Sequence, residues 1–234
     1  AKPKQPHYPD DARRDCWFCL ASPGCETHLV TGVGDTCYTC LPKGGLVDAH
    51  ALIVPIAHAS DRASLDDATL QELESTSDQL AKSFREKLNS HAVAFERVAD
   101  TKKGVYHIHR NIIPLPKRGS GDASRLVADF MDAAQRMSFR LVPVNDGVFR
   151  PAASDRFFVV DVYCGETGSK KRFACVQPKD ASQRFAGLHF GRDLLAAALG
   201  TPGRAHWKAC EVGRSDEERL VAAFKAKVLG EGGS

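Results

Sequence analysis

The chain has 234 residues and carries 32 lysine and arginine residues against 29 aspartate and glutamate residues, a formal net charge of +3. This length suits one large domain or two small ones, each with its own core. The small net charge does not mark the chain as a nucleic-acid binder, although local basic patches are compatible with it, and no apolar run approaches the length of a membrane span.

The polar start of the chain, residues 1–12, predicts a flexible segment, and the missing initiator methionine indicates a piece of a longer protein. Eight cysteines occur in a chain that lacks a secretory signal and the loop-rich character of a disulfide scaffold. We therefore expect reduced thiols in an intracellular protein.

Two Cys-x-x-Cys pairs follow, Cys16 with Cys19 and Cys37 with Cys40. The spacing of the first pair lets two thiolates bind one zinc ion from a single turn. A redox pair is the alternative, but no strand–helix context of that kind surrounds it. A four-cysteine zinc site is a second alternative. We disfavour it because residues three apart in a regular strand point to opposite faces, which keeps Cys37 and Cys40 from chelating together.

Short apolar runs and one long amphipathic stretch come next. Ser64 and Asp67 resemble a capping box at the start of the amphipathic stretch, which predicts a helix. The elements predicted here are strands at 28–31, 35–41, 50–58 and 92–98 and a helix at 64–90.

Residues 106–114 alternate polar and apolar side chains and end at a proline, which predicts another strand. Because side chains in a strand repeat every two residues, His107, His109 and Asn111 should share one face and Arg110 should lie on the other. Two imidazoles and an amide in one row suit metal or phosphate chemistry. The alternative is a half-exposed strand whose histidines have no function.

Beyond a basic, flexible joint at 117–121, helices and strands alternate again, and we expect Trp207 to anchor a core. The predicted elements are helices at 123–137, 190–199 and 215–228, strands at 156–163 and 172–176, and an irregular segment at 143–154. The whole chain predicts an α+β fold. A domain with an antiparallel sheet and a long helix, at 13–118, precedes a smaller α+β domain at 119–234.

The order of a Cys-x-x-Cys pair, a Pro-x-x-His segment and a His-x-His strand resembles the histidine-triad superfamily, over residues 16–114. The resemblance implies that 13–118 is a histidine-triad-like domain that contains a structural zinc ion. The matching zinc ligands are Cys16, Cys19, His58 and His107. The resemblance also implies that His109 is a nucleophile that attacks an α-phosphate to form a covalent phosphohistidine.

Asn111 stands where the signature has its third histidine. An amide can hydrogen-bond a phosphate or a leaving group, but it cannot transfer a proton at neutral pH. The change weakens simple hydrolysis without excluding chemistry, since hexose-phosphate uridylyltransferases carry a comparable glutamine and remain active. Backbone N–H groups near Gly104 would hold the phosphate oxygens.

A closer resemblance covers nearly the whole chain. CWFCLASP at 16–23, LPKG at 41–44 and FER at 95–97 are similar to the first of two C-terminal domains of CwfJ-type splicing proteins, and RFF at 156–158, FGRDLL at 190–195 and WKAC at 207–210 to the second. The resemblance implies a nuclear protein that acts on excised intron RNA, with spliceosome components and the lariat-debranching enzyme as partners.

Two functions fit these observations best. The first is binding of an intron RNA phosphate, such as that of the branched nucleotide, to assist lariat debranching. The second is a nucleotidyl hydrolase or transferase that works through His109, and a protein-binding scaffold is a third alternative. We favour binding. Cations that suit phosphate contacts are Lys43, Lys102, Lys103, Lys117 and Arg118, although each alone is more typical of a solvated surface than of a binding site.

Overall fold

The computed structural model describes residues 16–98, 106–117, 122–145, 147–153, 155–178, 181, 185–187 and 189–231. Some of the sequence predictions fall outside these residues. They concern the flexible segment 1–12 and the phosphate-binding candidates Lys102, Lys103, Gly104 and Arg118.

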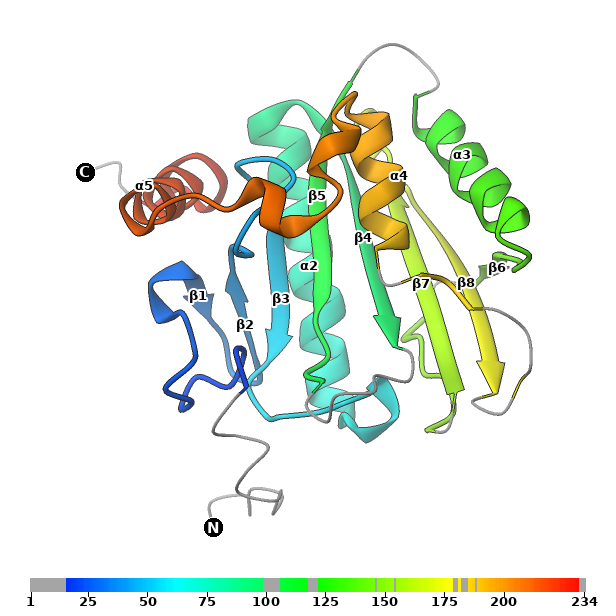
Figure 1. Cartoon of the computed structure of the whole chain (residues 1–234), viewed down its shortest axis with the longest axis horizontal. Helices are drawn as coiled ribbons and strands as arrows, with labels where there is room; N and C mark the ends of the chain where they lie inside the picture. The colour runs from blue at the N-terminus through cyan, green and yellow to red at the C-terminus, as the bar shows by residue number, and fades with distance from the viewer. Residues whose placement is uncertain are drawn as a thin grey trace.

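Within the described residues, eight strands form one antiparallel sheet in the order β1-β2-β3-β5-β4-β7-β8-β6 (Figure 1). The strands are β1 (Val30–Val33), β2 (Cys37–Cys40), β3 (Ala51–Pro55), β4 (Ser90–Val98), β5 (Arg110–Pro116), β6 (Val142–Val144), β7 (Asp155–Tyr163) and β8 (Lys170–Pro178). Every pair of neighbours is antiparallel. The predicted α+β class with an antiparallel sheet and a long helix is confirmed.

The sheet continues across the boundary predicted at residue 118. Strand β4 pairs with β7 along seven residue pairs, from Ala92↔Tyr163 to Val98↔Phe157. The strands of 13–118 and 119–234 therefore share one hydrogen-bonded layer. The division of the chain into two domains remains a prediction from the sequence.

Helices cover both faces of this layer. The α-helices of the described residues are α2 (Asp67–Leu88), α3 (Asp122–Arg136), α4 (Phe190–Ala198) and α5 (Arg214–Phe224), the last continued by a π-helical turn at Lys225–Leu229. Helix α2 lies behind the sheet in Figure 1, with α3 and α4 in front. Alternation along β4 serves both cores, because Ala94 packs with the α2 side while Val93 and Phe95 pack with α3 and α4. None of the helices described is both long enough and apolar enough to cross a membrane.

The long helix starts later than its capping-box pattern predicts. Its N-cap is Asp66, whose carboxylate accepts a hydrogen bond from the backbone N–H of Thr69 at 2.8 Å. Ser64 belongs instead to a short 3-10 turn, Arg62–Ser64, which Asp61 caps. The helix ends where Asn89 adopts the left-handed conformation, at φ 50°. The predicted capping box was therefore wrong, and the N-cap lies two residues later than predicted.

The polar–apolar alternation also placed the start of β5 too early. The strand begins at Arg110, and residues 106–109 are not in the ladder. The Ile108 N–H donates to the Ala59 carbonyl at 2.8 Å, so the chain here follows the loop after β3 instead. Strand β6 was missed because it is only three residues long and contains a proline.

Six buried charges form a closed ring between α2 and the sheet, which we call the ionic ring. Arginines and carboxylates alternate around it, so its formal charge is zero. Its members in order are Arg62, Glu96, Arg110, Asp161, Arg172 and Glu74, and Glu74 closes back on Arg62. The ring joins six elements from both predicted domains. Arg110 faces α2, and its Nε donates to Ser77 at 3.1 Å.

Candidate functional site

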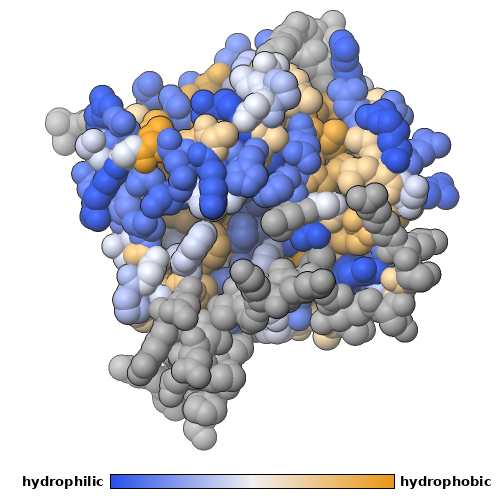
Figure 2. All heavy atoms as spheres, viewed as in Figure 1, coloured by the Kyte–Doolittle hydropathy of each residue, from blue (hydrophilic) through white to orange (hydrophobic). Residues whose placement is uncertain are grey.

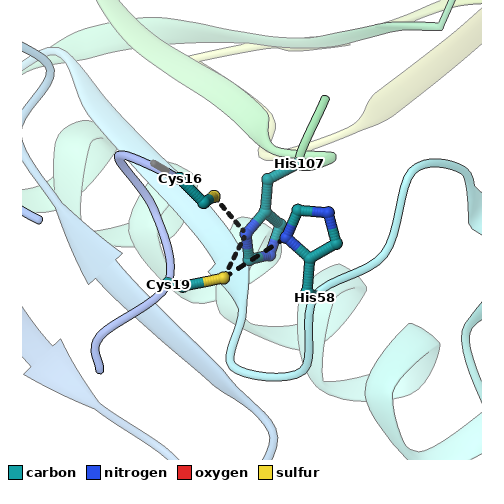
Figure 3. A group of neighbouring side chains, drawn as sticks. All are labelled: Cys16, Cys19, His58 and His107. Atoms are coloured by element: carbon teal, nitrogen blue, oxygen red, sulfur yellow. Dashed lines mark hydrogen bonds between the residues drawn. The ribbon is translucent and has the colours of Figure 1, made fainter. Parts of the chain in front are cut away.

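Four residues from three separate parts of the sequence meet at one end of the sheet (Figure 3). Each offers one ligand atom, and all four atoms lie within 4.8 Å of one another. All four are buried. They are Cys16, Cys19, His58 and His107. The two cysteines come from one turn, His58 comes from the loop after β3, and His107 precedes β5.

The spacing of these atoms matches a tetrahedral metal site. Cys19 Sγ lies 3.2 Å from His58 Nδ1 and 3.7 Å from His107 Nδ1, and Cys16 Sγ lies 3.5 Å from His107 Nδ1. Metal–sulfur and metal–nitrogen bonds of ordinary length at a tetrahedral angle put the two ligand atoms about 3.5 Å apart. The group could therefore hold a metal ion.

His107 is in the form that a metal requires. Its Nε2 donates to the Pro55 carbonyl at 2.9 Å, which leaves Nδ1 unprotonated and turned toward the thiols. Burial and the neighbouring His58 ring lower the pKa of His107 to about 3, so the ring is neutral. A backbone carbonyl behind a ligating histidine is a common support in metal sites.

The second Cys-x-x-Cys pair lies apart from this group, in β2. Cys37 Sγ faces α2 and lies 3.7 Å from the Thr69 carbonyl. Burial raises the pKa of Cys37 to about 12 and also raises that of Cys40, which disfavours the thiolate that a metal needs. All eight cysteines lie in the described residues, and none of them is in a disulfide bond.

His109 and Asn111 open on one cavity of about 540 Å³, which we call the His109 pocket. The His109 ring stacks on Phe18, with ring centres 4.7 Å apart, and Phe18 also meets the His107 ring edge-on at 6.2 Å. Phe18 lies between the two cysteines in the sequence. The turn that offers two metal ligands therefore also forms a wall of the pocket.

The orientation of His109 follows from one hydrogen bond. Its Nδ1 lies 3.0 Å from the backbone carbonyl of His107, which can only accept, so Nδ1 carries the proton. The lone pair of His109 is then on Nε2. Burial lowers the pKa of His109, which keeps the ring neutral.

Asn111 is held by His50. The Leu46 N–H donates to His50 Nδ1 at 3.2 Å, so the His50 proton is on Nε2, which donates to Asn111 Oδ1 at 3.1 Å. The carbonyl of the amide is thereby occupied, and its NH₂ group is available to a ligand in the pocket. Burial lowers the pKa of His50 to about 3, so this arrangement persists across the physiological range.

The predicted phosphate-binding cations do not all gather here. Lys43 lines the pocket, where its Nζ pairs with Glu26 at 2.9 Å. Lys117 follows the far end of β5, and its Nζ donates to Asn89 at 2.9 Å. Of the predicted cations that the structure describes, Lys43 therefore adjoins His109 and Lys117 does not.

Several pocket residues were not predicted from the sequence. Trp17, Trp207 and Arg192 line the cavity. Trp207 was expected in a core, but it is half-buried, and it meets Trp17 edge-on with ring centres 6.1 Å apart. That expectation was wrong because the segment after α4 crosses in front of β3 and β5 (Figure 1) instead of packing inside. In the sequence, only the position of Trp17 between two cysteines indicated that one of these residues lies near the site.

The sequence is similar to those of several known proteins. A family model described as "Protein similar to CwfJ C-terminal" matches residues 6–128. CWF19-like protein 1 of Mus musculus is 33% identical over 230 residues, which are 95% of this chain and 39% of that protein. Zinc finger CCCH domain-containing protein 64 of Arabidopsis thaliana is 32% identical over 91% of this chain and 35% of its own length. The chain thus spans about two fifths of the length of these curated relatives.

Among solved structures, yeast Ap4A phosphorylase Apa2 aligns over 78% of this chain and 78% of its own, with 15% identity and a TM-score of 0.42. A zinc-bound histidine triad family protein from Mycobacterium smegmatis aligns over 39% of this chain and 68% of its own, with 20% identity and a TM-score of 0.32.

Proposed function

Because the chain belongs to the family of proteins similar to the CwfJ C-terminal region, we propose that it is a nuclear RNA-processing factor that binds a phosphate of excised intron RNA in the His109 pocket. The proposed ligand is the branched nucleotide of a lariat, and the proposed result is assistance to debranching and intron turnover. Spliceosome components and the lariat-debranching enzyme are its proposed partners.

One observation carries this proposal: His109 and Asn111 open on the same cavity as Lys43 and two tryptophans. The cavity volume of about 540 Å³ is typical of sites for small organic ligands. Tryptophan rings stack on bases, while an amide NH₂ and an ammonium group suit phosphate oxygens. The pocket therefore offers groups for both parts of a nucleotide.

We propose that the four-residue group binds Zn²⁺ and that the ion is structural. Two thiolates and two imidazoles are a typical zinc donor set, and four protein ligands leave no position for a reacting water. The ion would fix the Cys16–Cys19 turn, and with it Phe18 against His109. Its contribution to binding would then be indirect, through the shape of the pocket.

The test compares linear and branched RNA of equal length by fluorescence anisotropy, together with metal analysis of the purified protein. We expect about one zinc per chain, tighter binding of the branched RNA, and at least tenfold weaker binding in His109→Ala and Asn111→Ala. Arg85→Ala is the control, because Arg85 lies on α2 behind the sheet. RNA affinity that is unchanged by both pocket substitutions, or a zinc content much below one ion per chain, would refute the proposal.

A second candidate, a nucleotidyl hydrolase or transferase, is favoured by the lone pair on His109 Nε2. In that reaction Nε2 attacks phosphorus, a P–N bond forms, and the P–O bond to the leaving group breaks. Water or another acceptor then attacks the same phosphorus, which breaks the P–N bond, frees His109 and transfers the nucleotidyl group to the acceptor. Asn111 would hydrogen-bond the leaving oxygen without supplying a proton. A phosphohistidine trapped with labelled nucleotide, and absent from His109→Ala, would establish this activity.

A further inference from the structure

A row of aromatic rings leads out of the His109 pocket across the surface. Trp17 meets Trp207 at 6.1 Å, Trp207 stacks on His206 at 6.3 Å with an interplanar angle of 14°, and His206 meets His189 at 5.1 Å. We call Trp17, Trp207, His206 and His189 the ring track. It joins the turn of the candidate metal group to the N-terminus of α4.

Packing in the core does not account for the exposure of these rings. The Trp17 side chain is 64% exposed, and every other exposed large hydrophobic residue among those the structure describes is a valine. His206 is exposed, and Trp207 and His189 are half-buried. The surrounding face in front of β3 and β5 is mostly hydrophilic (Figure 2). Part of the indole and imidazole surface of the track is thus exposed to solvent and accessible to a ligand.

Cations lie beside the rings of the track and in the adjoining pocket. Lys208 Nζ lies 5.6 Å from the centre of the Trp207 ring, and Arg192 and Lys43 line the adjoining pocket. Two acidic residues, Glu26 and Glu211, also line the pocket, and Glu26 is paired with Lys43. Rings interleaved with cations are typical of surfaces that bind single-stranded nucleic acid.

We propose that the ring track is a stacking platform for the bases of single-stranded RNA whose phosphate occupies the His109 pocket. This inference rests on the proposed function and specifies it: the ligand is a strand of several nucleotides, and its unpaired bases lie along Trp17 and three residues that the sequence assigned to the second domain. Stacking tolerates any base, so the track gives affinity and direction with little sequence preference.

The test measures affinity against RNA length, with AMP and with single-stranded oligonucleotides of increasing length. Binding is read by anisotropy and by intrinsic fluorescence, since the chain has only two tryptophans and both line the pocket. In the wild type, affinity should rise with length and tryptophan emission should be quenched. His206→Ala should weaken binding of the longer oligonucleotides about tenfold without changing AMP binding. Val176→Ala, an exposed residue of β8, is the control.

His206→Phe separates stacking from a structural role. His206 Nδ1 accepts a hydrogen bond from the Lys208 N–H at 3.3 Å, which phenylalanine cannot accept. If the ring stacks on a base, the phenylalanine variant retains the length dependence. If His206 acts only through that hydrogen bond, both variants lose it equally, which would refute the proposal.

The outcomes also separate this inference from the proposed function. Length dependence that is intact in His206→Ala, together with binding that fails in His109→Ala, refutes the ring track alone. Length dependence that is lost in His206→Ala, with no effect of His109→Ala, supports the track and refutes the pocket function. Wild-type affinity that does not grow with RNA length refutes the ring track as an RNA platform and favours a protein as the partner that covers these rings.

Discussion

Replacement of Arg110 by methionine should destabilise the protein more than any surface change. Arg110 is 1% exposed, and its guanidinium donates to Ser77, Glu96 and Asp161. Methionine fills most of the volume but changes the charge of the ionic ring from zero to −1. Glu96 and Asp161 each keep one arginine, Arg62 and Arg172 respectively. The loss is therefore that of one partner in a buried network, about 3–5 kcal/mol.

Urea unfolding at constant metal content measures this loss. The control is Arg214→Met, which breaks an exposed pair with Glu218 and should cost at most about 0.5 kcal/mol. A double variant, Arg110→Met with Asp161→Asn, restores a neutral ring and should be no less stable than Arg110→Met alone. A loss in Arg110→Met below about 1 kcal/mol would show that the ionic ring is not a buried, interdependent network.

Three further predictions concern the site. Cys19→Ser should lower the bound metal from about one equivalent to a small fraction, with a matching fall in melting temperature, whereas Cys175→Ser should leave the metal content unchanged. The pKa of His50 is about 3 in the folded chain against an ordinary 6.5, so the unfolded chain binds the extra proton and stability falls as the pH drops. From pH 7 to 5 this costs about 2 kcal/mol, which His50→Gln should remove; an unchanged pH slope in urea unfolding would contradict the assignment. Gly44→Ala should cost about 2 kcal/mol and shift tryptophan emission, because Gly44 has φ +72° and an added Cβ would lie 2.1 Å from the Trp207 carbonyl oxygen, whereas Gly203→Ala meets nothing within 4 Å.

Local patterns predicted those features of the site that depend on neighbouring residues. Two-residue alternation placed Arg110 on the opposite face from His109 and Asn111, and the structure agrees. The same alternation could not locate the start of β5, because Ile108 is held by the loop after β3. That hydrogen bond joins segments 49 positions apart (Ile108 and Ala59), which no local pattern records.

The ionic ring shows a second limit. Its six members appeared in the sequence as ordinary charged residues of strands and a helix, and hydropathy favours exposure for each of them. Their pairing depends on the order β5-β4-β7-β8 and on the position of α2 behind those strands. The prediction that Trp207 lies in a core was wrong for the opposite reason, because a large aromatic residue suits a core as well as an exposed ligand site. The candidate metal group was found because the resemblance linked a local cysteine pair to two distant histidines.

The continuous sheet makes one last prediction, about the division at residue 118. A fragment of residues 13–118 would lose β7 from β4 and would expose Val93 and Phe95, which now pack under α3 and α4. It would also lose Asp161 and Arg172, which opens the ionic ring. An exposed apolar face beside a long unpaired edge promotes aggregation. We therefore expect the fragment to be aggregated or unfolded in size-exclusion chromatography and circular dichroism, while the whole chain is monodisperse. A folded, monomeric fragment with a full complement of metal would show that the first half is an independent domain and that the shared sheet is a docking contact.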